Sequence, residues 1–164
     1  MNEAEGRFTV LRQSADPAAV NAIEQLVREA TDRDLNRINV FDFAARYGVA
    51  EDHVIATFLH ATARCFPNAP ALSFGDELIH RYAGLQERVA RLAGGLRALP
   101  GVKPGDRIAL AMKNSPQYIE LMWAGWHAGL CIVPMNAKLH PKEFAFILEN
   151  CGVGYCFATP DLTG

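Results

Sequence analysis

The stretch WHAGLCIVPMNAKLHPKEF, from Trp126 to Phe144, decides the fold class of this chain. Its first residues end an apolar helix at Gly129, and the run Leu130–Val133 that follows is short and apolar, as in a buried strand. A polar loop then leads to Pro141, which predicts the first turn of another helix. Helix, strand and helix joined by such short connections indicate an α/β protein.

Similar elements lie on both sides of this junction. The segment Arg107–Met112, RIALAM, is bounded by turn residues and predicts a strand that is buried on both faces. Ser115-Pro116 predicts the start of the helix that follows, and Val153–Phe157 predicts a third buried strand. Strands and helices that alternate in this order form a parallel βαβαβ unit with right-handed crossovers.

A β-hairpin is expected before this unit. Ala71–Phe74 and Leu78–Tyr82 flank Gly75-Asp76, a pair that is typical of hairpin turns. A helix is then predicted over residues 83–99. Its buried stripe is predicted from the apolar residues Leu85, Val89, Leu92, Leu96 and Leu99.

The polar side of that helix carries Glu87, Arg88 and Arg91, which we expect to face solvent. Gly94 and Gly95 interrupt the helix at a cost of about 1 kcal/mol each relative to alanine. We interpret this pair as allowing close approach of another backbone.

Residues up to about Ala63 predict only helices. Asp16-Pro17 indicates the start of the first helix, Asn39 caps the second, which Gly48 ends, and residues 50–52 open the third. The expected apolar faces are Val20, Ile23, Leu26, Val27 and Ala30 in the first helix, Phe41, Phe43 and Ala44 in the second, and Val54, Ile55, Phe58, Leu59 and Thr62 in the third.

The turn at Tyr47–Val49 gives this region a helix-turn-helix outline. Its second helix, DHVIATFLHATA, has no Arg, Lys, Asn or Gln that would contact base edges. The whole chain of 164 residues has a formal net charge of −2, so no general attraction to polyanions exists. We therefore expect helical packing and no nucleic-acid partner.

Composition places the chain among ordinary globular proteins, because half of its residues are hydrophobic and 21% are charged. The N-terminus does not resemble a secretory signal, and no apolar run is long enough to span a bilayer. We expect a cytoplasmic location and reduced cysteines. Cys65, Cys131, Cys151 and Cys156 are interpreted as small apolar residues, three of them in or beside buried strands.

Two longer segments carry a family resemblance. FPNAPALSFGDELIHRYAGLQERVARLAGGLRAL and VKPGDRIALAMKNSPQYIELMWAGWHAGLCIVPMNAKLHPKEFAFILENCG resemble, in order and spacing, the start of AMP-forming acyl-CoA synthetases, members of the adenylate-forming ligase family. The resemblance covers residues 63–161. It implies an incomplete part of that family's large lobe, with residues 1–62 as a helical segment and 63–164 as the N-terminal part of an AMP-binding domain.

The same resemblance implies an activity for the full-length protein. The family uses ATP and Mg to convert a fatty or aromatic carboxylic acid to an acyl-adenylate, and then CoA to form the thioester. The family's phosphate-binding loop, rich in Ser, Thr and Gly with a lysine, has no counterpart in residues 1–164, and neither has the catalytic lysine of its C-terminal lobe. We therefore assign no catalytic, cofactor-binding or metal-binding residue, and expect the fragment to be inactive alone.

One local departure from the family lies at the start of the helix over residues 83–99. The family usually has Thr before the helix tyrosine and Glu shortly after it, whereas this chain has Arg81 and Gly84. A cation near the positive end of a helix and a glycine are both unfavourable, so we expect a weakened helix start.

Three polar residues are candidates for ligand contact. Asn136, Lys138 and His140 follow the predicted strand Leu130–Val133, at the carboxyl edge where open α/β sheets bind ligands. A role as a surface loop is favoured over substrate contact, because the resembled family places its reacting groups elsewhere.

Other candidates for chemistry are weaker. His53 and His60 share one helix face without a third ligand, which argues against a zinc site. His127 is interpreted as an imidazolium that interacts with the helix dipole. Cys151 or Cys156 with His140 as a base would make a nucleophile pair, but structural thiols are favoured.

The residues leave one alternative from another class. The chain would then be a non-catalytic regulatory module, with the helical segment or an exposed sheet edge as the surface for a protein partner. Residues 34–62, DLNRINVFDFAARYGVAEDHVIATFLHAT, resemble the helical region before the cyclase domain of some bacterial class III adenylate cyclases. The meeting of the two resemblances is open to three interpretations: a true fusion, a frameshifted gene or chance similarity.

Overall fold

The computed structural model describes residues 9, 12–13, 15–29, 40–49 and 51–162. The helical segment contains α2 (Pro17–Glu29), α4 (Val40–Tyr47) and α5 (Glu51–Cys65). The hairpin β1 (Pro70–Phe74) and β2 (Glu77–Arg81) follows, and then α6 (Tyr82–Arg97). The remaining elements are β3 (Arg107–Met112), α7 (Pro116–His127), β4 (Cys131–Asn136), α8 (Pro141–Cys151), β5 (Tyr155–Ala158) and the short 3₁₀ helix η1 (Pro160–Leu162).

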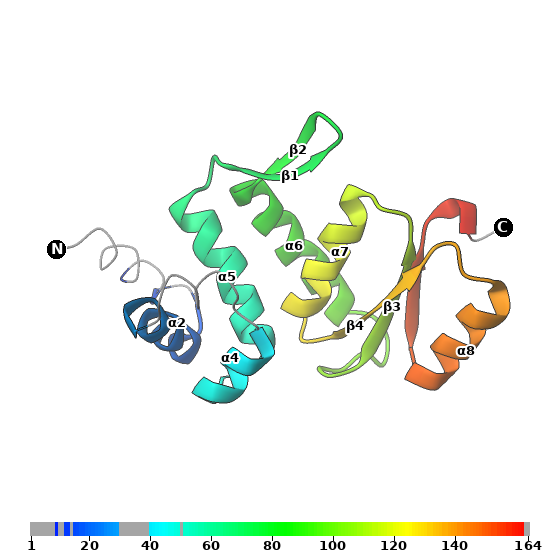
Figure 1. The fold of residues 1–164 in the computed structure, drawn as a ribbon, viewed down its shortest axis with the longest axis horizontal. Coiled ribbons are helices and arrows are strands. Elements are labelled where there is room, and N and C mark those ends of the chain that lie inside the picture. The colour runs from blue at the N-terminus through cyan, green and yellow to red at the C-terminus, as the bar shows by residue number, and fades with distance from the viewer. Residues whose placement is uncertain (1–8, 10–11, 14, 30–39, 50, 163–164) are drawn as a thin grey trace.

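A three-stranded parallel sheet in the order β4-β3-β5 forms the α/β part, which confirms the predicted βαβαβ unit. Helices α6 and α7 cover one face of the sheet, where Ile108 packs with Ala124 and Ala128. Helix α8 covers the other face, where its residues Phe144 and Ile147 pack against the cluster around Ala109. Figure 1 shows α7 and α8 on opposite sides of the strands.

Only the central strand is buried on both faces. Every residue of β3 after Arg107 is buried, as expected. The prediction that the other two strands are buried was wrong, because β4 and β5 lie at the two edges of this sheet and are largely accessible. Cys131 and Cys156 lie on these edge strands and are exposed, so they are not buried apolar residues.

Helix α7 packs between the sheet and the helices α5 and α6, which explains why it is apolar around most of its circumference. Close contact with the sheet occurs at Gly125, where an added Cβ would lie 2.2 Å from Cδ1 of Ile132. The close approach expected at Gly94 and Gly95 is absent, because nothing lies within 4 Å of a Cβ built at either residue. Both glycines lie on the exposed side of α6.

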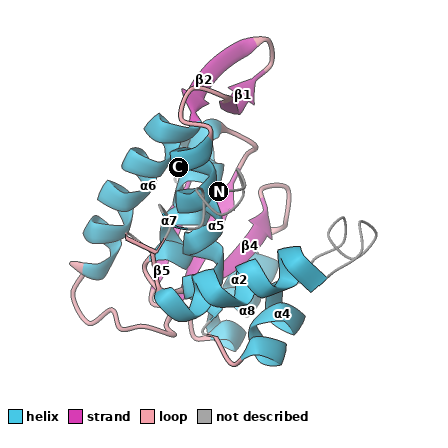
Figure 2. Cartoon of the chain, turned by 90° about the vertical axis from the view of Figure 1, so that its left-hand side faces the viewer, coloured by secondary structure: helices cyan, strands magenta, loops and turns pink. Residues whose placement is uncertain are grey.

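The β1–β2 hairpin forms as predicted and extends beyond the helices (Figure 2). Gly75 has a φ of 59° in its turn, a backbone conformation that glycine adopts at little cost. The weak start expected for α6 is supported by backbone contacts instead of a side-chain cap. The N–H groups of Tyr82 and Ala83 donate to the carbonyl oxygens of Ala69 and Pro67.

The helical segment has the predicted helix-turn-helix outline, with Gly48 at a φ of 64° between α4 and α5. Asp16 caps α2 by accepting the N–H of Ala19 at 2.8 Å. Val27 was wrongly expected on the buried face, since it is 45% exposed. The expectations for Asn39 and Ala30 fall outside the described residues.

Helix α5 belongs to two hydrophobic clusters. Near its start, Val54 packs with Val20 and Phe43 of the helical segment. Further along α5, Leu59 packs with Leu85 and Val89 of α6. In Figure 1 α5 accordingly lies between α2 and α4 on one side and α6 and α7 on the other. Among the described residues, none of the helices combines the length and apolar character that crossing a bilayer requires.

Candidate functional site

A cleft opens at the carboxyl edge of the parallel sheet. Met112 and Asn136 are register partners at the ends of β3 and β4, and the loops that follow these strands surround a cavity of about 650 Å³. The residues that line it are Met112, Lys113, Asn114, Tyr118, Pro134, Met135, Asn136, Ala137 and Lys138. This edge is where parallel α/β sheets bind ligands.

The polar groups of the cleft have local partners. Asn136 Oδ1 accepts the N–H of Lys138 at 2.9 Å, which shapes the loop. Lys113 Nζ forms an ion pair with Asp161 Oδ2 at 2.5 Å, and the hydrogen bond from Lys113 lowers the pKa of Asp161. Asp161 lies in η1 after β5, so loops after all three strands meet at this edge.

The sequence placed Asn136, Lys138 and His140 in one cluster, and the structure separates them. Asn136 and Lys138 line the cavity, but His140 does not. His140 instead caps α8: its Nδ1 accepts the N–H of Lys142 at 3.2 Å, while its own N–H donates to Glu143 Oε2 at 2.8 Å. The capping role explains why histidine is useful there without ligand contact.

The positive charge at the cleft is reduced by Asp161, which pairs with Lys113. Lys113 and Lys138 line it, and α7 begins beside it with Ser115 Oγ accepting the N–H of Tyr118 at 3.3 Å. A helix N-terminus carries partial positive charge. Of the residues that line the cavity, none is a carboxylate, a histidine or a cysteine, and its titratable side chains are Lys113, Tyr118 and Lys138.

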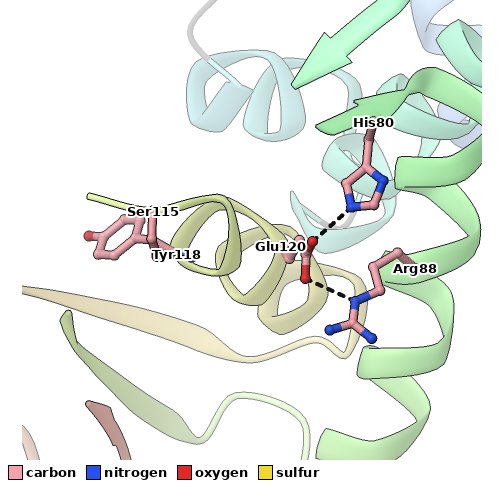
Figure 3. A network of polar contacts seen from close by, with 5 residues as sticks. All are labelled: His80, Arg88, Ser115, Tyr118 and Glu120. Carbon is pink, nitrogen blue, oxygen red and sulfur yellow. Dashed lines mark hydrogen bonds and ion pairs between the residues drawn. The ribbon is translucent and has the colours of Figure 1, made fainter. Parts of the chain in front are cut away.

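A second polar group, which the sequence reasoning missed, is centred on Glu120 of α7 (Figure 3). Glu120 is only 4% exposed, and its carboxylate accepts hydrogen bonds from His80 Nε2 at 2.8 Å and Arg88 Nε at 2.9 Å. Burial by itself raises the pKa of Glu120, but the hydrogen bonds from Arg88 and His80 bring it below its usual value. The available signal in the sequence was a single acidic residue, Glu120, inside the apolar run of α7.

This network joins the hairpin to both helices, because His80 lies on β2, Arg88 on α6 and Glu120 on α7. Arg88 therefore does not simply face solvent as expected: half of its side chain is accessible while its Nε reaches Glu120. Gly84 lies close to His80, since a Cβ built at Gly84 would be 3.7 Å from His80 Nδ1. The resembled family usually has Glu near this position.

The surroundings of His127 disfavour the imidazolium form that the sequence suggested. Burial lowers the pKa of His127, and the nearby charges of Arg97 and His60 lower it further, so the neutral ring is favoured. The cation at the end of α7 is Arg97, whose Nη2 donates to the backbone carbonyl of His127. His60 likewise has a lowered pKa, chiefly from burial and then from Arg64.

The remaining candidates are not brought together. His140 is at the start of α8, Cys151 at its end and Cys156 on β5. Among the described residues no three His, Cys, Asp or Glu side chains are close enough to hold a metal ion. The side chain of His53 is outside the described part of the chain.

Comparison with known proteins gives two family matches. Residues 59–163 match the AMP-binding enzyme family, and residues 1–66 match a family of unknown function (DUF5939). The two matches overlap at the C-terminal end of α5.

Individual relatives agree with the first match. A feruloyl-CoA synthase from Amycolatopsis sp is 42% identical over 99 residues, which are 60% of this chain and 20% of that protein. A mitochondrial medium-chain acyl-CoA ligase from Rattus norvegicus is 35% identical over 95 residues, 57% of this chain and 15% of that protein. The chain thus spans about a fifth of the length of the feruloyl-CoA synthases that it matches.

Solved structures share the fold. A Mycobacterium tuberculosis fatty acyl CoA synthetase superposes with a TM-score of 0.61 at 28% identity, covering 66% of this chain and 22% of that chain. A benzoate CoA ligase from Burkholderia xenovorans LB400 gives the same TM-score at 27% identity, over 66% of this chain and 22% of that one. Because the family model matches residues 59–163, most of its length, this chain belongs to the AMP-binding enzyme family.

Proposed function

We propose that this chain supplies the first part of the large lobe of an AMP-forming acid:CoA ligase that acts on a fatty or aromatic carboxylic acid. The observation that carries the proposal is the continuous family match over residues 59–163, which runs from α5 through the hairpin and the whole βαβαβ unit. The similar proteins include a feruloyl-CoA synthase, a medium-chain acyl-CoA ligase and a benzoate CoA ligase.

The proposed reaction has two steps. A carboxylate oxygen of the acid attacks the α-phosphorus of ATP, and pyrophosphate leaves as the acyl-adenylate forms. The CoA thiolate then attacks the acyl carbon, the thioester bond forms, and AMP leaves. Charge that develops on the phosphate in the first step needs positioned donors and cations.

Residues 1–164 provide little of that stabilisation. They contain no Ser/Thr/Gly-rich loop with a lysine, and among the described residues no three His, Cys, Asp or Glu side chains come together. Lys138 and the start of α7 favour an anionic part of a substrate in the cleft, whereas the charge of Lys113 is already paired with Asp161. We infer that turnover needs further residues of the ligase fold.

An ATP-dependent thioester assay tests this proposal. The purified chain is supplied with ATP, magnesium, CoA and a panel of ferulate, benzoate and medium-chain acids, and pyrophosphate and CoA thioester are measured. We expect no turnover from this chain alone, and turnover once the downstream Ser/Thr/Gly-rich loop and the rest of the lobe are present in frame. Turnover by the chain alone at the rate of a complete synthetase would contradict the proposal.

A second candidate function is a regulatory or interaction module. It is supported by the separate match of residues 1–66 to a family of unknown function and by the packing of α5 against α6. In this reading residues 1–62 form one unit and 63–164 another, and the α/β part is a scaffold without catalysis. Reading the encoding DNA beyond residue 164 discriminates between the two, since an unrelated downstream sequence favours the module.

A further inference from the structure

Helix α5 has two apolar faces that overlap along its length. Val54, Phe58 and Ala61 belong to the hydrophobic cluster of the helical segment, and their helical spacing places them on one side of α5. Leu59 lies between Phe58 and Ala61 in the sequence but packs into the cluster of α6. The same turns of α5 are therefore held from two sides.

Helices α2 and α4 pack on the first of these faces. Val20 of α2 is completely buried and Phe43 of α4 is 4% exposed, and both lie in the cluster that contains Val54. In Figure 1 α2 and α4 lie on the side of α5 that is away from α6 and α7. Among the described elements, α5 is thus the one on which both α2 and α4 pack.

The second face of α5 packs on the α/β part. Leu59 is 4% exposed and contacts the buried residues Leu85 and Val89 of α6. Trp123 of α7 packs against the same cluster, and α6 and α7 cover one face of the parallel sheet. Buried side chains therefore connect α2, through α5, to the two helices that cover the sheet.

The helical structure of α5 depends on this packing. The helix has 15 residues, a length at which an isolated helix is marginal in water. Loss of α2 from α5 exposes part of the face that contains Val54 and Phe58, and this removes packing that keeps α5 helical. Leu59 is then held less firmly against α6, because it lies on the same turns as Phe58.

We infer that the helical segment and the α/β part form one cooperative unit, in which α5 transmits a change at α2 to α6 and α7. Residues 1–66 and 59–163 match different families, but the two matches share the C-terminal half of α5. The two parts are therefore not energetically independent. This inference does not rest on the proposed ligase reaction, and it applies equally to a module without catalysis.

Amide hydrogen exchange of the full chain tests the coupling with two variants of one helix. Val20→Ala and Val27→Ala remove the same methyl groups from α2, but Val20 is completely buried whereas Val27 is 45% exposed. We expect Val20→Ala to accelerate exchange about tenfold or more in α2, in α5 and in α6 around Leu85 and Val89, because buried methyl groups are lost and a cavity is left. Val27→Ala should leave exchange in α6 unchanged.

Acceleration by Val20→Ala that stops at α5, while α6 keeps the wild-type rate, overturns the inference. The reciprocal variant Leu85→Ala should accelerate exchange in α2, because coupling between two sites acts equally in both directions, and unchanged exchange in α2 also overturns it. If Val20→Ala does not fold, exchange of the wild type in increasing urea decides. A common opening of α2 and α6 supports the coupling, and a separate, earlier opening of α2 overturns it.

Discussion

The surroundings of the two halves of α7 have opposite effects on a buried charged side chain. In the first half Glu120 is enclosed, but two cationic or hydrogen-bonding partners converge on its carboxylate from other elements. In the second half, burial and then the nearby charges of Arg97 and His60 lower the pKa of His127, which disfavours its protonated form. The comparison shows that cationic neighbours stabilise the charge on Glu120 and disfavour a charge on His127, because the two side chains of α7 would carry charges of opposite sign.

The middle of α7 keeps both halves on the sheet, so Gly125→Ala should have the largest effect. The added Cβ would lie 2.2 Å from Cδ1 of Ile132 and 3.3 Å from Cδ1 of Ile108, both ends of side chains, so the expected cost is the overpacking of about 1–3 kcal/mol less a gain in helix propensity of up to about 1 kcal/mol. Urea unfolding followed by circular dichroism measures it. Gly94→Ala is the matched control: with nothing within 4 Å it should gain up to about 1 kcal/mol. Equal effects of the two changes would contradict the close approach of α7 to the sheet.

The second-largest effect is expected when the hydrogen bonds to Glu120 in the first half of α7 are weakened. Glu120→Gln keeps the shape but removes the charge that His80 and Arg88 share, and hydrogen bonds to charged groups contribute about 1.5–3 kcal/mol. We expect a loss of about 2 kcal/mol, since Arg88 is half accessible and keeps part of its hydration. Amide exchange should rise in β1 and β2 more than in β3. Glu87→Gln, which removes an exposed partner of Arg91, should change stability by less than about 0.5 kcal/mol.

The pH dependence of stability distinguishes the contributions of the two halves of α7. The lowered pKa of His60 and His127 means that stability falls as the pH drops below 6.5. The lowered pKa of Glu120 means that its contribution is complete above 4.5 and is lost only as the pH falls through its folded-state value. Urea midpoints measured from pH 8 to 3 should fall in two stages. A single stage below pH 4.5 would show that the histidines contribute nothing.

The smallest expected effect concerns Arg97→Gln. The change removes the guanidinium that binds the carbonyl at the end of α7, which costs about 0.3–1 kcal/mol at an exposed helix end. It also removes one cation that disfavours protonation of His127, so the pKa of that ring should rise. NMR titration of His127 checks the direction. The same change at Arg91, whose partner is Glu87, should leave the His127 titration where it is.

Much of the architecture was predictable because it depends on local signals. The caps at Asp16 and Ser115, the hairpin turn at Gly75 and the apolar run of β3 each specify an element through neighbouring residues, and all were confirmed. The carboxyl-edge location of Asn136 and Lys138 also followed from strand order alone. These features need only the periodicity and the turn chemistry of a short segment.

The errors share a physical cause, which is that burial and charge depend on the neighbours supplied by tertiary structure. The sequence could not show that β4 and β5 lie at the sheet edges, that Gly125 rather than Gly94 meets another element, or that Arg88 reaches Glu120. A residue's pKa likewise depends on the groups that converge on it from other elements, as at His127.

The sequence by itself determined the order of helices and strands, the parallel α/β class and the resemblance to ligases, since propensity, capping and hydrophobic spacing act over a few residues. Only the tertiary structure decided that α5 joins two hydrophobic clusters and that Glu120 is paired while His60 and His127 face cations. Those contacts join residues that are far apart in the sequence, and no local pattern shows which distant residues will be in contact.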